Sequence, residues 1–227
     1  MKQKSADGFF LKGEELLVLL LLSGVEKLYG FQIPAMEHFT EREAEQAIFT
    51  LGQKGFAVEE AGQIKLNDKV KAFVELMVSA DSAVYAQKNG LKMESLCLYL
   101  NSAEKEKPVV CMEIIGEEGK ILRISFYENV LTCIEEKGFL LEEIFADDML
   151  YQENEWKEDI DLKNMKWQTS LEVSNVRTGE LQKRLLFFKC PIKDFLLEEA
   201  GEKKTIYVYS RRMLKKRLYE EAERDEI

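Results

Sequence analysis

The chain has 227 residues, 46% hydrophobic and 33% charged, a composition that predicts a globular protein with a sizeable core. Its net charge of −10 disfavours a nucleic-acid or anionic-membrane partner, because phosphate binding requires clustered Lys and Arg. The four cysteines form no CxxC pair, so we interpret them as reduced core residues of a cytosolic protein.

An apolar run, LLVLLLL at residues 16–22, lies near the start of the sequence. Glu14 and Glu15 directly precede it and no small-residue cleavage site follows, which argues against a signal peptide. The run is also shorter than the roughly 20 residues that a membrane span requires. We therefore expect a buried helix over residues 14–24 and no insertion into a membrane.

Residues 12–80 have the order helix, helix, small hairpin, helix, which is the outline of a winged helix. Thr40 and Glu43 form a capping box that opens the second helix. Short strands are predicted at 56–60 and 63–66, and Asn67 or Asp68 caps a third helix. A transcription regulator is therefore one alternative. Acidic residues outnumber basic ones in the first turn of the second helix, which opposes DNA binding.

The next segment alternates apolar and polar residues with the period of half-buried strands. Strands are predicted at 83–87 and 95–101, followed by a strand–turn–strand–helix unit over residues 108–138. Short antiparallel connections predict an α+β fold, with a mostly antiparallel central sheet and flanking helices.

Residues 128–161 contain 12 acidic and 2 basic residues, a local charge of −10. A helix is predicted over 139–151, followed by an irregular connection over 152–164. This acidic segment is either a solvated linker or an apolar helix with an acidic rim for a partner. Asp147 and Asp148 do not predict a metal site, because adjacent acids on a helix point in different directions.

The pattern of the last part of the chain predicts a repeat of the strand–turn–strand–helix unit. Strands are predicted at 166–174 and 181–189, a helix at 192–200, a strand at 205–209 and a final helix from Arg211. Aligning Gly119 with Gly179, and residues 135–138 with 198–201, gives two halves related by a pseudo-twofold, 1–151 and 152–227. The winged-helix-like segment 12–80 belongs to the first half.

No residue set in the sequence amounts to an active site. His38 is the single histidine, and the motifs of nucleophilic, nucleotide-binding and zinc enzymes are missing. We predict no catalytic residue, no cofactor and no metal. An enzyme without a recognisable motif is a second alternative.

Three stretches of the N-terminal half resemble the EspG-type chaperones of type VII secretion. They are the Leu-rich helix that ends at Gly24, LGQKGF at 51–56 and QIKLNDKVKAFVELM at 63–77. The resemblance implies a mixed sheet with helical bundles and a pseudo-twofold. It also implies a cytosolic, non-enzymatic protein that binds helical secretion substrates, such as PE–PPE pairs or WXG- or LXG-like proteins, and masks their aggregation-prone tips.

From this resemblance we expect a cytoplasmic chaperone or adaptor, a monomer or weak dimer, with a helical secreted protein or protein pair as partner. We expect the partner to dock on the second half, near the strand at 181–189 and the last helix. The residues predicted to contact it are Leu185, Phe187, Arg211, Leu214, Arg217 and Leu218.

Overall fold

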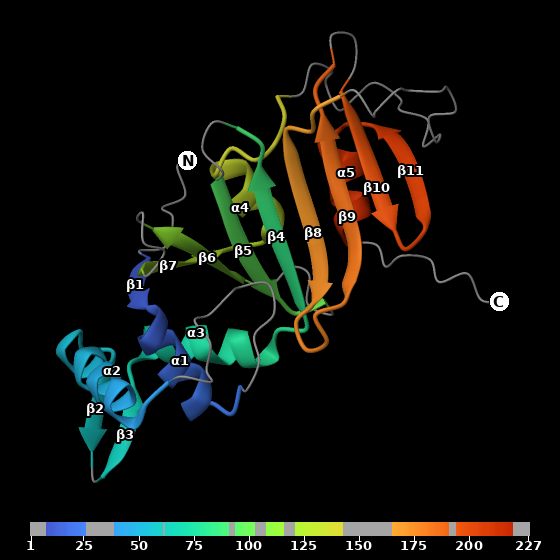
Figure 1. The fold of residues 1–227 in the computed structure, drawn as a ribbon. Helices are drawn as coiled ribbons and strands as arrows, with labels where there is room; N and C mark the ends of the chain where they lie inside the picture. Colours follow the sequence, from blue (N-terminus) through green and yellow to red (C-terminus); the bar gives the residue numbers. More distant parts are fainter. Residues whose placement is uncertain are drawn as a thin grey trace.

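A computed structural model describes residues 8–25, 39–60, 62–90, 94–102, 108–115, 121–142, 165–190 and 194–219. These residues form a nine-stranded antiparallel sheet with helices on both faces, and a separate two-stranded hairpin (Figure 1). The strands are β1 (Phe9–Lys12), β2 (Ala57–Glu60), β3 (Gln63–Leu66), β4 (Ser82–Lys88), β5 (Glu94–Leu100), β6 (Val109–Ile115), β7 (Ile121–Tyr127), β8 (Thr169–Asn175), β9 (Leu181–Phe188), β10 (Phe195–Ala200) and β11 (Lys203–Val208). The helices are α1 (Gly13–Leu22), α2 (Glu41–Gln53), α3 (Asp68–Ser79), α4 (Val130–Glu136) and α5 (Arg211–Tyr219).

The large sheet has the strand order β1-β7-β6-β5-β4-β8-β9-β10-β11, and every neighbouring pair is antiparallel. The predicted α+β class and antiparallel sheet are therefore confirmed. Strand β1 was not predicted, because its four residues run directly into α1 and are too short to show a period of two.

The two sides of the sheet have the same order of elements, running outward from the central pair β4 and β8. From β4 the chain continues through adjacent strands to β7 and then α4, and from β8 it continues through adjacent strands to β11 and then α5. Each half is thus a four-stranded meander followed by a helix. Helix α4 corresponds to α5, so the predicted alignment of Gly119 with Gly179 was wrong by one hairpin.

The helix predicted over residues 192–200 was wrong: Phe195–Ala200 is strand β10. Its sequence FLLEEA has good helix formers and a following glycine, which mimic a helix with a glycine C-cap. The segment pairs with β9 on one side and β11 on the other, and burial of both its faces decides the conformation. Gly201, with φ of 58°, lies in the tight turn into β11 rather than at a helix end.

The N-terminal elements have the predicted order of helix, helix, hairpin and helix. Thr40 caps α2, accepting from the Glu43 backbone N–H while the Glu43 carboxylate accepts from the Thr40 backbone N–H. Asn67 caps α3 by accepting from the Val70 backbone N–H at 2.9 Å. The description as a winged helix stays a prediction.

Two hydrophobic cores lie on opposite faces of the sheet. Helices α1, α2 and α3 pack on one face over the first half, around residues such as Phe73, Met112 and Ile124. Helices α4 and α5 pack on the other face, around residues such as Leu98 and Phe187. We call these the α1/α3 face and the α4/α5 face. No helix in the part of the chain described here is long and apolar enough to cross a membrane.

Only residues 139–142 of the helix predicted over 139–151 are among the described residues. Phe139–Glu142 is not helical, and the remainder, with the connection over 152–164, lies outside the described residues. The division between halves at 151 and 152 falls in the same segment and stays a prediction. His38, Asp147 and Asp148 also lie outside the described residues.

Candidate partner-binding face

The four apolar residues predicted to contact a partner lie inside the molecule. Leu185, Phe187 and Leu214 are fully buried and Leu218 is 6% exposed, all in the core between the sheet and α5. Phe187 packs against Tyr209 with ring centroids 5.3 Å apart. These side chains hold α5 on the sheet, and a partner could reach them only if α5 left it.

The two predicted arginines pair with carboxylates of the same chain. Arg217 donates from Nε to Glu198 at 2.6 Å and lies over the Tyr207 ring, 5.0 Å from its centroid. Arg211 forms an ion pair with Glu135 on α4. The structure therefore brings all six predicted residues together, but as the contact of α5 with the sheet and with α4.

The opposite side of the same strands carries a different set of apolar residues. Because side chains alternate along a strand, Leu186 and Phe188 point away from α5, onto the α1/α3 face. None of the described helices covers this face over β8–β11, whereas α5 lies behind it in Figure 1. We call it the second-half sheet face, and define it by Glu172, Arg184, Leu186, Phe188, Phe195, Leu197, Glu199, Lys204, Ile206 and Val208.

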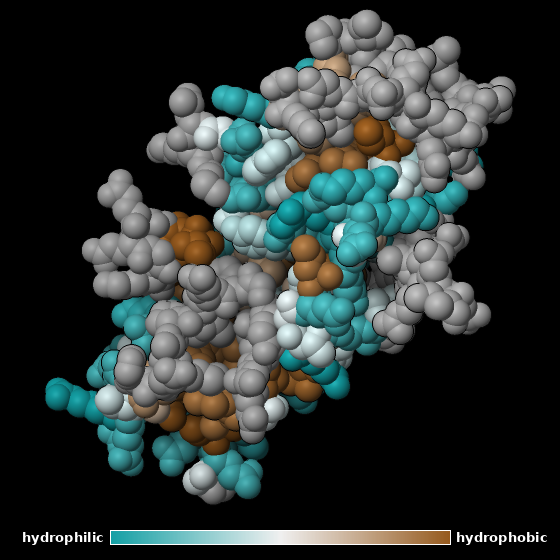
Figure 2. Space-filling view, turned by 45° about the vertical axis from the view of Figure 1, so that its right-hand side comes forward, coloured by the Kyte–Doolittle hydropathy of each residue, from teal (hydrophilic) through white to brown (hydrophobic). Residues whose placement is uncertain are grey.

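Two apolar rows run across this face from strand to strand. The pairing register aligns Leu186, Leu197 and Ile206 in one row. It aligns Phe188 and Phe195 with Val208 in the next. Phe188, Phe195 and Leu197 form a small buried cluster, and Leu186 and Ile206 are half-buried at its margin. In Figure 2 hydrophobic surface appears at the upper end of the molecule, beside a hydrophilic band.

A ladder of alternating charges borders the apolar rows. Arg184 Nε lies 2.7 Å from Glu172 Oε1 and its Nη1 lies 3.5 Å from Glu199 Oε2. Glu199 Oε1 in turn accepts from Lys204 Nζ at 2.5 Å. The four side chains come from β8, β9, β10 and β11 in register. Partly exposed pairs of this kind add little stability individually, so their main effect is to fix the register and the polarity of this border.

The four cysteines are free; Cys97, Cys111 and Cys133 are buried, as predicted for core residues, and Cys190 is partly exposed. Burial raises the pKa of Cys97 to about 12 and also raises the pKa of Cys133. Burial, with the nearby Asp194 carboxylate, raises the pKa of Cys190, which lies beside the second-half sheet face. These three groups are thiols at neutral pH. The described residues contain no cluster of His, Cys, Asp and Glu that could hold a metal ion.

No family model matches the sequence, and no curated protein matches it. A comparison with solved structures finds the Mycobacterium tuberculosis type VII secretion system chaperone EspG5, solved in complex with a PE25–PPE41 dimer. The TM-score is 0.54 at 8% identity, covering 92% of this chain and 93% of the chaperone chain. This chain has the fold of that chaperone. The fold-level part of the predicted resemblance is therefore confirmed.

The second-half sheet face could not be chosen from the sequence alone. Residues 185–188 read LLFF, so the strand lacks the polar–apolar contrast that would separate its two faces. The signal that points to this face is the register of charged residues, which places Arg184 between Glu172 and Glu199. This register can be read only when the strand order is known.

Proposed function

We propose that the protein is a non-enzymatic cytoplasmic chaperone that binds a helical secreted protein or protein pair and keeps it soluble. The observation that supports this is the shared fold, which extends over 92% of this chain and 93% of a chaperone that was solved with a PE25–PPE41 dimer. Because the match covers nearly the whole of both chains, the likeness is one of complete architecture and not of a common small motif.

The docking surface in this proposal is the second-half sheet face. Its half-buried apolar residues suit the apolar stripe of a helix: Leu186, Ile206 and Val208 lie beside the buried cluster and keep part of their surface exposed. The charge ladder on the border offers both signs, from Glu172 at one end to Lys204 at the other, which favours one orientation of a helical partner. In this proposal the partner binds to the second half near β9, the region that the sequence analysis predicts.

The test is co-expression with helical secretion substrates encoded next to this protein, followed by affinity purification and size-exclusion chromatography. We expect a stable complex with one such protein or pair. Leu186→Glu should reduce recovery of the complex about tenfold or more, because it introduces a carboxylate into the apolar row.

Ile121→Glu is the matched control, since Ile121 is also an apolar strand residue, is 45% exposed and lies on β7 in the first half, away from the second-half sheet face. Its complex should be recovered as for the natural chain. Absence of any complex would remove the proposed function. Equal losses for the two variants would remove the second-half sheet face as the docking surface.

A further inference from the structure

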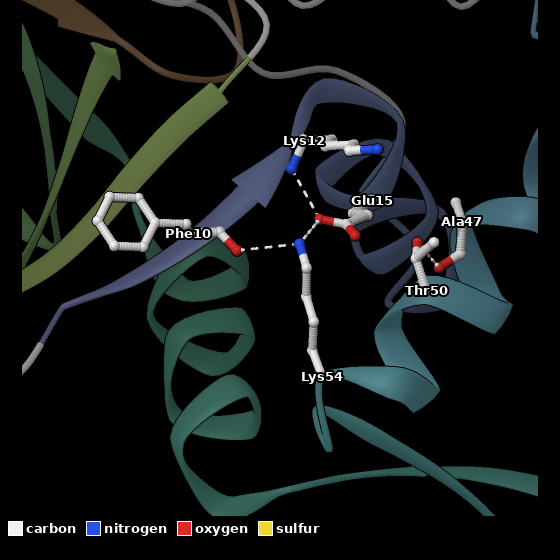
Figure 3. Close-up of polar contacts among 6 residues, drawn as sticks. All are labelled: Phe10, Lys12, Glu15, Ala47, Thr50 and Lys54. Atoms are coloured by element: carbon white, nitrogen blue, oxygen red, sulfur yellow. Dashed lines mark hydrogen bonds and ion pairs between the residues drawn. The ribbon is translucent and has the colours of Figure 1, made fainter. Parts of the chain in front are cut away.

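The two edge strands of the nine-stranded sheet, β1 and β11, differ in the hydrogen bonding of their outward backbone groups. At one edge, two backbone groups of β1 that would pair with a further strand already have partners. Lys54 Nζ donates to the Phe10 carbonyl at 3.3 Å, and the Lys12 backbone N–H donates to Glu15 Oε2 at 2.7 Å (Figure 3). This edge therefore cannot accept another strand without breaking these bonds.

At the other edge, β11 is the outermost strand in Figure 1 and pairs on one side only, with β10. A two-residue turn at Gly201 joins the two strands, so Lys203, Thr205 and Tyr207 direct their backbone groups to β10. The backbone groups of the alternate residues, Lys204, Ile206 and Val208, point outward. Within the described residues, no other backbone group bonds to them.

We propose that this free edge pairs with a second copy of the chain, β11 against β11 in antiparallel register about a twofold axis at Ile206. In that register Ile206 faces its own copy and Lys204 faces Val208 of the other chain. Three opposed pairs would each exchange two bonds, giving about six backbone hydrogen bonds.

Charge favours this register over a parallel one. The lysines of β11, Lys203 and Lys204, are both at the end nearest the turn. In the antiparallel pair they lie at opposite ends of the new ladder, so that no lysine faces another. A parallel, in-register pair would place like charges directly opposite each other, which is destabilising.

The pairing also extends the surface on which the proposed function rests, although it does not depend on that function. The row formed by Leu186, Leu197 and Ile206 ends at the free edge. Contact between the two Ile206 side chains would join it to the same row of the second copy. A single sheet of eighteen strands would then carry one apolar row across both copies, in which Leu186 and Ile206 are half-buried and Leu197 is buried.

The dimer is expected to be weak, because two short edge strands bury less than the roughly 1,200 Å² typical of stable interfaces. Sedimentation velocity should show the mass rising from one chain to two between about 10 µM and about 1 mM protein. Ile206→Pro should abolish this rise, because it removes an outward N–H without removing a bond to β10. Ile206→Val keeps that N–H and should dimerise like the natural chain.

Cross-linking tests the register. In a Cys190→Ser background, Ile206→Cys should form a disulfide-linked dimer on mild oxidation, because facing Cα atoms in such a pair are about 5.5 Å apart. Lys204→Cys is the matched control and should cross-link far more slowly, since its own copy is not opposite. A single-chain mass at all concentrations would overturn the proposal. Self-association that Ile206→Pro leaves intact would also overturn it. So would a chain that binds the partner without self-associating and loses that binding in Ile206→Pro.

Discussion

Arg217 on α5 donates from Nε to Oε2 of Glu198 on β10 over 2.6 Å, and the Glu198 side chain is only 5% exposed. The same turn of α5 is held a second time, because Lys183 Nζ on β9 donates to the Arg217 carbonyl at 2.6 Å. The last helix is thus fixed to the sheet by polar contacts as well as by its buried Leu214 and Leu218.

Arg217→Met should destabilise the protein by about 2–3 kcal/mol, because it leaves the buried Glu198 carboxylate without its guanidinium. Urea unfolding followed by circular dichroism measures the change. Arg212→Met on the same helix is the control: Arg212 is exposed, and its loss should cost less than about 0.5 kcal/mol. Equal costs for the two variants would contradict a specific role for the pair.

Lys54→Met should loosen the attachment of α2 to the β1 edge. Glu15 is 1% exposed and its Oε2 accepts from Lys54 Nζ at 2.6 Å, so removing the ammonium leaves a buried carboxylate that only the Lys12 N–H partners. The expected cost is about 2 kcal/mol, since Lys54 is itself partly solvated. Hydrogen exchange should also quicken at β1 and along α2.

Lys71→Met serves as the control for Lys54→Met, because Lys71 makes only an exposed contact of 3.9 Å with Glu75 one turn away on α3. It should change the free energy of unfolding by less than about 0.5 kcal/mol. If Lys54→Met unfolds at the same urea concentration as the natural chain, the bond from Glu15 does not contribute to stability.

The parts of the fold that the sequence predicts well are those specified locally. The caps at Thr40 and Asn67 begin α2 and α3, and alternation identifies β4 to β7. Strand β10 fails because its conformation is decided by pairing with β9 and β11, which no local pattern encodes. Recognising two halves was sound, but placing their correspondence requires the strand order, which aligns α4 with α5.

The face to which a single residue of the candidate surface belongs also could not be predicted from local sequence. Leu185 and Leu186 are adjacent and equally apolar, yet one lies under α5 and the other on the opposite face. Which of them is covered depends on where the chain turns after β11, a non-local choice. Sequence reasoning therefore selected the face of β9 that the protein uses for its own helix.

The capping box of α2 predicts a pH-dependent contribution to stability. Glu43 accepts from the Thr40 backbone N–H at 2.7 Å and then from its hydroxyl at 2.8 Å, and these bonds lower the pKa of Glu43 below 4.5. A lowered pKa in the folded state means that the ionised carboxylate stabilises the fold. That contribution is present above the unfolded pKa and is lost as pH falls through the folded one.

Glu43→Gln should therefore unfold at a lower temperature than the natural chain near neutral pH, and the difference should shrink as the pH falls below the ordinary pKa of a glutamate. Glu45→Gln is the control, because Glu45 is exposed on the same helix and lies outside the capping box. A difference between Glu43→Gln and the natural chain that stays constant from neutral to acid pH would argue against a role for the carboxylate charge.

The thiols should be slow to react in the folded protein. Cys97, Cys111 and Cys133 are buried, and Cys190 is the one with partial exposure. Because burial raises the pKa of Cys190, its thiolate fraction is lower than that of a free cysteine at the same pH. With a disulfide reagent at about pH 8, we expect one slow thiol in the native protein and four fast ones after unfolding. Cys190→Ser should remove the slow native reaction, and rapid native labelling of two or more thiols would contradict the burial of the other three.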